Sequence, residues 1–334
     1  GIITFAMILL LLSFNRVESQ WIQSAGPFGG YIKQLVFNAS NDAFAATNGG
    51  VLIKASTSPS WSYVNNGLTT NDIRALVTIG SNLFAGGYEV SGSPGGVFLS
   101  TNKGLNWTAR NSGLTNKTIT ALGVNGSNLF AGTNGAGVYF SSNNGLNWVQ
   151  INNGLSGLSL VINNFYTSGG NVYAGTREGL AVSTNNGQSW VVNVNGLQNE
   201  FSKRVTAITI KGSNFFIGTG LGIFVSTDGG ANFTSAQGDL GFTSINSLNN
   251  DGTVLIAGCQ NGGVFKSTND GLNWTAFNTG LTNLYVNSIN IISNYVYVGT
   301  QGGGVYYSLN NSNWVNSIDG MYNTSPKSFD IKET

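Results

Sequence analysis

The stretch Ser100-Thr101-Asn102-Lys103-Gly104-Leu105-Asn106-Trp107 recurs along the chain and decides its fold. Its pattern is Ser-x-Asx-x-Gly-x-x-aromatic. Near-complete copies begin at Ser141, Ser183, Ser226 and Ser267. Two incomplete copies, which lack the glycine, occupy 56–61 and 308–314. The aromatic residues stand at positions 61, 107, 148, 190, 233, 274 and 314, so the spacing is 40 to 46 residues. A period of this size is typical of a repeat fold built from propeller blades or solenoid units.

Each position of the repeated stretch has a structural reason. An Asx side chain accepts backbone N–H groups within a tight turn, and glycine supplies a positive φ that other residues resist. The serine hydroxyl binds the same backbone, and the aromatic ring is buried where the next strand begins. We therefore expect these positions to be structural rather than functional. They are Ser100, Asn102, Gly104, Trp107, Ser141, Asn143, Gly145, Trp148, Ser183, Asn185, Gly187, Trp190, Ser226, Asp228, Gly230, Phe233, Ser267, Asn269, Gly271 and Trp274.

This repeat resembles the Asp-box, or bacterial neuraminidase repeat, of sialidases, xyloglucanase-type glycoside hydrolases, sortilin-type receptors and the photosystem II assembly factor. The resemblance covers about residues 21 to 316. Most copies carry Asn where the family prefers Asp, and Asp228 alone keeps the acid. Because the turn requires a hydrogen-bond acceptor and not a charge, the fold interpretation is unaffected. The resemblance implies that the motif stabilises the fold and lies far from any active site.

Between the turns, each unit contains four short apolar runs separated by turn residues. In the third unit these runs are 119–124, 128–133, 137–141 and 147–150. The pattern predicts an all-β, seven-bladed β-propeller of four-stranded antiparallel blades, with the repeated turn between strands three and four. The inner strands are expected to begin near Ile32, Ile73, Ile119, Ile162, Val205, Ile245 and Val286. The expected blades are 31–65, 72–110, 118–151, 161–194, 204–236, 244–277 and 285–317, with a tail at 318–334. No helix of useful length is expected.

The N-terminal segment Ile2 to Leu12 is almost purely apolar but too short to span a bilayer. It fits the hydrophobic core of a secretory signal peptide, which is predicted over residues 1–19 with cleavage before Gln20. The propeller is then predicted over residues 20–334. An uncleaved membrane anchor is the alternative. Secretion to the extracellular space, cell surface or periplasm is therefore expected, without membrane insertion after cleavage. Trp21–Gln23 and Ser328–Ile331 resemble further strands, and which end closes the ring stays open, as does a further domain downstream.

Composition limits the chemistry. The net charge of +1 gives no electrostatic reason to expect nucleic acid or an anionic membrane as a partner. With no His and one Cys, neither imidazole metal sites, His-based triads nor an internal disulfide can form. No metal or cofactor is expected. Cys259 is expected to be a buried apolar residue, the alternative being a reactive thiol.

The resemblance also bears on catalysis. Sialidases of this kind share an arginine triad, a tyrosine nucleophile and an Arg-Ile-Pro segment, but this chain has five Arg and no such segment. The xyloglucanase-type enzymes carry an Asp before Gly-Gly in the first blade, where this chain has Asn48 before Gly49-Gly50. An amide cannot act as the general base. We therefore predict a non-catalytic binding module for a glycan or an extracellular protein, acting as a monomer or as one domain of a longer chain. A glycoside hydrolase is the first alternative, and an assembly or scaffold factor is the second.

Departures from the repeat indicate where a ligand binds. Blade two carries an insertion at 86–96 between its second and third strands, and blade four places two charged residues at the equivalent turn. Each inner strand also has a polar second residue, expected near the channel mouth, and the alternative is that these residues only solvate the channel. The predicted ligand-binding residues are Tyr88, Glu89, Arg177, Glu178, Lys33 and Arg74.

Overall fold

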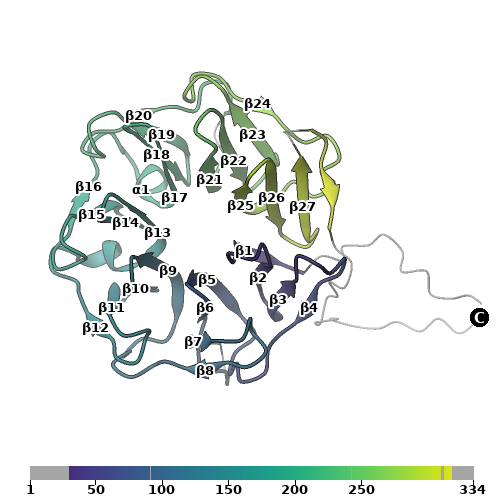
Figure 1. Ribbon diagram of the computed structural model, residues 1–334. Coiled ribbons are helices and arrows are strands. Elements are labelled where there is room, and N and C mark those ends of the chain that lie inside the picture. The colour runs from purple at the N-terminus through teal and green to yellow at the C-terminus, as the bar shows by residue number, and fades with distance from the viewer. Residues whose placement is uncertain (1–29, 91, 242, 310–311, 318–334) are drawn as a thin grey trace, which may run out of the picture.

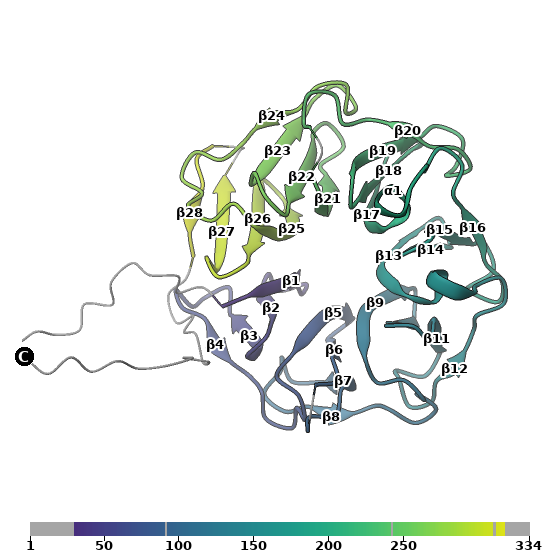
Figure 2. The ribbon, with the colours of Figure 1, turned by 180° about the vertical axis from the view of Figure 1, so that it is seen from behind.

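Seven four-stranded antiparallel sheets form a ring around a central channel (Figures 1 and 2). The computed structural model describes residues 30–90, 92–241, 243–309 and 312–317. The predicted seven-bladed propeller is confirmed. The expected signal peptide, the strands expected at Trp21–Gln23 and Ser328–Ile331, and the tail at 318–334 lie outside the described residues.

The four strands of each blade are consecutive in the sequence. Blade one contains β1 (Ile32–Phe37), β2 (Ala43–Thr47), β3 (Gly50–Lys54) and β4 (Ser62–Tyr63). Blade two contains β5 (Ile73–Ile79), β6 (Asn82–Gly87), β7 (Gly96–Ser100) and β8 (Thr108–Ala109). Blade three contains β9 (Ile119–Asn125), β10 (Asn128–Thr133), β11 (Val138–Ser141) and β12 (Val149–Gln150). Blade four contains β13 (Ile162–Ser168), β14 (Asn171–Thr176), β15 (Gly179–Ser183) and β16 (Val191–Asn193).

Blade five contains β17 (Val205–Lys211), β18 (Asn214–Thr219), β19 (Gly222–Ser226) and β20 (Thr234–Ser235). Blade six contains β21 (Ile245–Asn250), β22 (Leu255–Cys259), β23 (Val264–Ser267) and β24 (Thr275–Ala276). Blade seven contains β25 (Val286–Ile292), β26 (Tyr295–Thr300), β27 (Val305–Leu309) and β28 (Val315–Asn316). All seven inner strands begin at the predicted residues.

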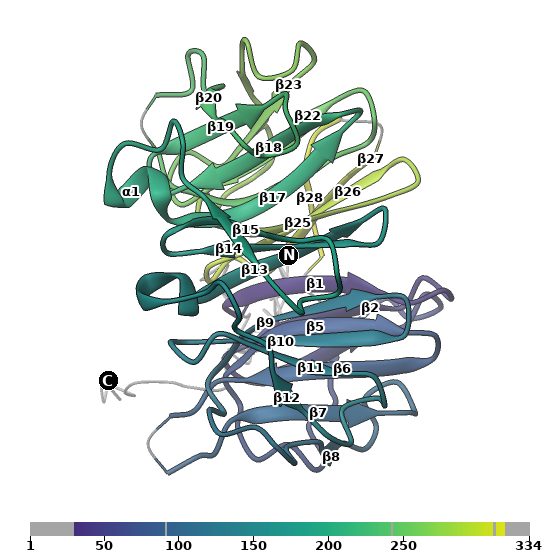
Figure 3. The same cartoon turned by 90° about the vertical axis from the view of Figure 1, so that its left-hand side faces the viewer.

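Two short helices lie in the crossings on either side of blade four. They are the 3₁₀ helix η1 (Gly157–Leu160) and α1 (Glu200–Lys203), which projects from one face of the ring in the side view (Figure 3). Asn199 caps α1, because its side chain accepts the N–H groups of Phe201 and Ser202. None of the helices in the described part of the chain has the length and apolar character that a bilayer crossing requires.

The repeated turn joins each blade to the one before it. In blade two, the Ser100 hydroxyl accepts the N–H of Gly104 at 2.7 Å, and the Asn102 side chain accepts the N–H of Asn106 at 2.9 Å. Trp107 is buried, and its indole N–H donates to the carbonyl of Val64 in blade one at 2.6 Å. The equivalent tryptophans of blades three, four and six are 4 to 5 % exposed and donate to the preceding blade in the same way. Their predicted burial is confirmed.

Every inner strand contains a β-bulge at its second residue. In blade one, Ile32 pairs with Thr47 and Gln34 pairs with Ala46, so Lys33 has no partner on β2. A bulge redirects a side chain and is often found beside functional sites. The bulged residues are Lys33, Arg74, Thr120, Asn163, Thr206, Asn246 and Asn287.

The ring closes through side chains and through an isolated backbone bridge between Tyr31 and Gln301. The indole N–H of Trp61 donates to the carbonyl of Ser317 at 2.9 Å, and the amide of Asn287 donates to the carbonyl of Ile32 at 2.8 Å. Within the described residues, no strand is exchanged between blade one and blade seven. Cys259, at the end of β22, is fully buried as predicted.

Candidate functional site

Five of the seven bulged residues donate a side-chain hydrogen bond to the next blade. Asn163 donates to the carbonyl of Val205 at 2.8 Å, and Asn246 donates to that of Val286 at 2.9 Å. Thr120, Thr206 and Asn287 make the equivalent bond to the first residue of the following inner strand. Because a buried carbonyl needs a donor, these five side chains hold the ring together. They do more than solvate the channel.

Lys33 and Arg74 occupy the same position but make different contacts. The ammonium group of Lys33 donates to Asp72, and Arg74 Nη2 lies 3.3 Å from the other carboxylate oxygen. The guanidinium carbon of Arg74 lies 3.2 Å from the centre of the Tyr88 ring, and Lys33 Nζ lies 5.6 Å from the centre of the Tyr31 ring. We call these five residues the mouth cluster: Tyr31, Lys33, Asp72, Arg74 and Tyr88.

The mouth cluster carries a net positive charge, because one carboxylate faces two cations. Burial would raise the pKa of Asp72, but hydrogen bonds from Lys33 and Arg74 outweigh burial and hold that pKa below its usual value. Burial lowers the pKa of Lys33, and Asp72 offsets part of that shift. The side chains of Lys33 and Asp72 are 16 % and 18 % exposed, whereas that of Arg74 is 35 % exposed. Arg74 is therefore the most accessible charge in the ion-paired part of the cluster.

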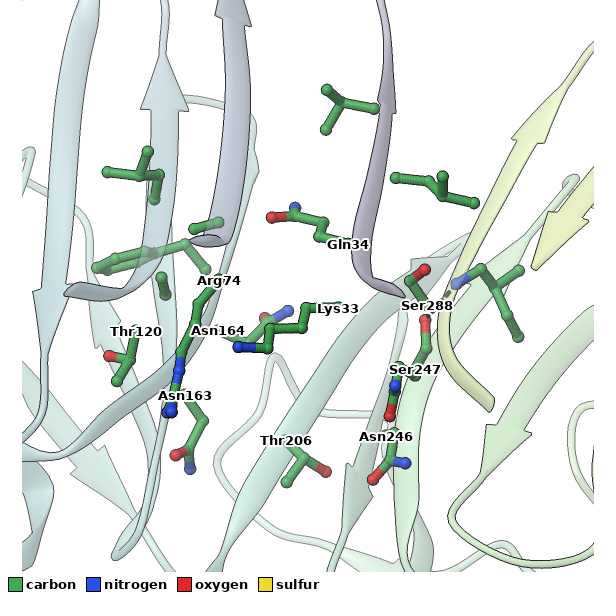
Figure 4. A pocket seen from close by; sticks show the side chains of 18 of the residues that line it. Lys33, Gln34, Arg74, Thr120, Asn163, Asn164, Thr206, Asn246, Ser247 and Ser288 are labelled. Atoms are coloured by element: carbon green, nitrogen blue, oxygen red, sulfur yellow. Dashed lines mark hydrogen bonds between the residues drawn. The ribbon is translucent and has the colours of Figure 1, made fainter. Parts of the chain in front are cut away.

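A cavity of about 490 Å³ opens at the cluster. Its lining includes side chains from blades one, two, three and seven, which are Tyr31, Lys33, Asn48, Arg74, Thr120 and Asn287. It shares four of these residues with the smaller channel cavity of about 260 Å³, where inner-strand side chains converge (Figure 4). The volume lies within the range of about 300 to 1,000 Å³ typical of small-molecule sites. Most lining groups are hydrogen-bond donors or acceptors, so the cavity suits a polar ligand.

The structure brings together three of the six predicted binding residues: Lys33, Arg74 and Tyr88. The hydroxyl of Tyr88 also accepts a hydrogen bond from Asn134 of blade three at 3.3 Å. Glu89 follows Tyr88 in the insertion, where it is exposed and does not line the cavity.

Arg177 and Glu178 lie in the β14–β15 turn of blade four, away from the mouth cluster. Glu178 lies 3.8 Å from Lys203 on α1, and neither turn residue lines the mouth or channel cavity. The cluster therefore belongs to one sector of the ring and does not reach blade four.

Sequence reasoning missed Asp72 and Tyr31. Each directly precedes the first residue of an inner strand, and Asp72 is the only acidic residue at that position in the seven blades. The single acidic residue at this position was the sequence signal that could have pointed to Asp72.

The described residues that line the mouth cavity include no Asp or Glu. Asp72 is not among the lining residues and is bound by both cations. Glycoside hydrolysis ordinarily uses a pair of carboxyl groups on either side of the scissile bond, and this lining does not present such a pair. In the described part of the chain, no group of three or more His, Cys, Asp or Glu side chains is placed to hold a metal ion.

The comparisons with known proteins identify the class of fold. Scans against known protein families and against curated protein sequences find no match, so membership of the Asp-box family is not shown. Among solved structures, the GH74 xyloglucanase from Xanthomonas campestris superposes with a TM-score of 0.70 at 17 % identity, over 88 % of this chain and 55 % of that chain. The extracellular domain of the putative one component system BT4673 from B. thetaiotaomicron gives 0.69 at 17 % identity, over 84 % and 38 %.

A third structure, YCF48 bound to D1 peptide, gives a TM-score of 0.66 at 15 % identity, over 85 % of this chain and 94 % of that chain. This chain thus spans about half of the xyloglucanase and less than half of the BT4673 domain. At these identities the likeness shows the seven-bladed propeller fold alone.

Proposed function

We propose that this chain is a non-catalytic binding propeller that takes an acidic glycan at the mouth of its channel. The observation that carries the proposal is the division among the seven bulged residues. Five of them bind a neighbouring backbone carbonyl, whereas Lys33 and Arg74 form a charged cluster with Tyr88 beside an open cavity. Lys33 also joins blade one to blade two through Asp72, whereas Arg74 makes no hydrogen bond to blade three among the described residues.

The chemistry of the lining favours a sugar acid. A ligand carboxylate complements the net positive charge. Because Nε and Nη2 of Arg74 face Asp72, the ligand carboxylate binds the remaining N–H groups of the guanidinium. A pyranose ring offers a C–H-rich face to Tyr31 and hydroxyl groups to the amide of Asn48. Neighbours named as GH74 xyloglucanases support a glycan ligand, although the described residues of the mouth lining do not include the paired carboxyl groups of a hydrolase.

A peptide with an acidic side chain is the second candidate for the same cavity. The observation that favours it is the neighbour named as YCF48 bound to D1 peptide, which is covered over 94 % of its length. A location outside the cytoplasm, at the cell surface or in the periplasm, is part of the proposal and rests on the apolar segment Ile2 to Leu12.

The test is a titration of the full chain with oligogalacturonate and with its neutral reduced counterpart, followed by calorimetry. We expect the acidic glycan to bind, the neutral one to bind at least about tenfold more weakly, and the affinity to fall as salt rises. Arg74→Ala should abolish most of the binding. Arg177→Ala is the matched control, because Arg177 carries the same charge but lines neither the mouth cavity nor the channel cavity. Equal binding of both glycans, with no effect of Arg74→Ala, would overturn the proposal. Binding of an acidic peptide alone would favour the second candidate.

A further inference from the structure

The junction between blade seven and blade one has an unusual turn. In blades two to six the repeated turn spans eight residues from serine to aromatic, whereas in blade one it spans six, from Ser56 to Trp61. The shorter turn contains Pro59 and no glycine. Blade one therefore presents a smaller turn to the blade behind it.

In the longer turns, the glycine packs against side chains of the preceding blade. A Cβ added at Gly187 of blade four would lie 2.3 Å from Ile151 and 3.4 Å from Phe130, both in blade three. Phe130 is completely buried beneath this turn. Gly104 of blade two lies against Val64 of blade one in the same way. Because blade one lacks this glycine, the aromatic face of blade seven has no equivalent cover.

Blade seven carries three tyrosines on that face. Tyr295 and Tyr297 lie on β26 and Tyr307 lies on β27, with ring centres 5.9 to 6.1 Å apart. Blades two, three and five have a completely buried phenylalanine at the position equivalent to Tyr297. Tyr297 itself is only half-buried. The position of Tyr295 is asparagine in blades two to five, at Asn82, Asn128, Asn171 and Asn214. Hydroxyl-bearing aromatic rings thus occur at the junction that the short turn leaves open.

A cavity of about 490 Å³ lies over these tyrosines, and we call it the junction cavity. The short turn contributes Ser56, Ser58 and Trp61 to its wall, and Asn41, Ser293 and Ser317 add polar groups. The described lining includes no Asp or Glu, and the ammonium of Lys54 donates to the hydroxyl of Ser317 at 2.8 Å. The described lining is therefore aromatic and rich in hydroxyl groups, with one side-chain amide from Asn41 and one charged residue, Lys54.

The junction cavity is separate from the mouth. Strand β1 runs from Ile32, beside the mouth cluster, to Phe37, which lines the junction cavity and packs on Tyr297 with ring centres 4.8 Å apart. The two cavities share no lining residue. A ligand in one does not occupy the other.

We infer that the junction cavity binds a neutral carbohydrate. A pyranose ring has C–H-rich faces that stack on tyrosine rings, and its hydroxyl groups match a rim of serine, asparagine and tyrosine. The low charge of the lining complements a neutral ligand and gives an acidic one no counter-charge beyond Lys54. The volume again lies within the range of about 300 to 1,000 Å³ for small-molecule sites.

The test titrates the full chain with neutral oligosaccharides of glucose, xylose, mannose and galactose, followed by calorimetry and tyrosine fluorescence. We expect at least one to bind. Tyr295→Asn installs the residue of four other blades, and Tyr307→Leu installs the residue of blade two, so both variants should fold. Each should weaken binding by about tenfold, the upper value for loss of an aromatic contact. Replacing residues 56–61 with the eight-residue turn of blade three should fill the cavity and abolish binding.

Arg177→Ala is the control that should leave neutral-sugar binding unchanged, because Arg177 lines none of the three cavities. Arg74→Ala should remove acidic-glycan binding at the mouth, which separates the two sites. Absence of binding to every neutral sugar, or unchanged binding by both tyrosine variants, would overturn the inference. If the parent binds no neutral sugar and Tyr295→Asn lowers the melting temperature by several degrees, the cavity is filled by the chain itself and the inference is again wrong. Neither outcome affects the proposal for the mouth.

Discussion

The buried carboxylate of Asp42 lies 2.9 Å from the ammonium group of Lys103. Asp42 belongs to blade one, where it is 2 % exposed, and Lys103 stands within the repeated turn of blade two. The same carboxylate accepts the backbone N–H of Ser56 and the side-chain amide of Asn38, each at 2.9 Å. One acidic group thus links the turns of two neighbouring blades.

This ion pair makes stability depend on pH. Burial would raise the pKa of Asp42, but hydrogen bonds from Lys103, Ser56 and Asn38 outweigh burial and lower the pKa to about 2. A carboxylate with a lowered pKa stabilises the folded chain above its ordinary pKa of 3.8, and this contribution is lost as pH falls from 4 towards 2. We expect Asp42→Asn to lower the free energy of unfolding at pH 7 by about 2 kcal/mol, and to have a smaller effect at pH 2.

Urea unfolding at pH 7, 4 and 2 checks this prediction. Glu178→Gln is the control, since that carboxylate is more exposed and 3.8 Å from its partner. The same loss of stability between pH 4 and pH 2 in the parent and in Asp42→Asn would contradict the assignment.

The tryptophans of the repeated turn should be major contributors to stability. Truncation of Trp148, Trp190 or Trp274 to Ala is expected to cost about 3 to 5 kcal/mol, the usual range for a buried aromatic residue. Replacement by Phe keeps most of the buried area and removes the indole N–H bond to the preceding blade, so about 1 kcal/mol is expected. Chemical unfolding measures both. If all three Ala variants were nearly as stable as the parent, these tryptophans would not contribute to the packing between blades.

The bulged residues should separate into two functional groups. Asn246→Ala removes the donor to the carbonyl of Val286 and should cost about 1 to 3 kcal/mol in stability, without changing ligand affinity at the mouth. Arg74→Ala should do the reverse, because Arg74 bonds to no neighbouring blade carbonyl in the described structure. Unfolding and binding measured on both variants test this division. Equal loss of ligand affinity in the two would show that all bulged residues serve one purpose.

The Arg74–Tyr88 contact offers a finer test of the mouth. Arg74→Lys keeps the charge but loses the planar group that faces the Tyr88 ring, so acidic-glycan affinity should fall by about three- to tenfold. Calorimetric titration of this variant beside Tyr88→Leu is the measurement. Parent-like affinity in Arg74→Lys would mean that charge alone matters there.

Cys259 should be inert in the folded chain. Burial raises the pKa of its thiol to about 12, with a small opposing contribution from Thr243, so the thiolate is scarce at pH 8. A disulfide reagent is expected to modify the thiol within minutes in denaturant and not measurably in the native state over hours. Rapid native modification would instead indicate a reactive thiol.

The fold was predictable because its determinants are local. The serine, asparagine and glycine of each turn act on backbone groups within four residues, and the aromatic spacing gives the blade length. The mouth was only partly predictable. Lys33 and Asp72 are 39 residues apart, and their contact depends on a bulge that leaves no trace in hydrophobic alternation. Arg177 occupies a turn equivalent to that of Tyr88, but the ring places it two blades away.

The closure of the ring between blades one and seven has a consequence for how the molecule assembles. Every blade is a local meander whose strand pairs form within about 20 residues, and each new blade packs on the one just completed. Folding can therefore advance from one end to the other in step with synthesis, as in linear repeat proteins. In the described chain, only the latch between blades one and seven joins residues more than 250 positions apart. It includes the Trp61–Ser317 and Asn287–Ile32 hydrogen bonds, the Tyr31–Gln301 bridge and the Phe37–Tyr297 ring contact. Under heat or mechanical load the circle should part there first, leaving an open spiral of intact blades that recloses when the latch re-forms.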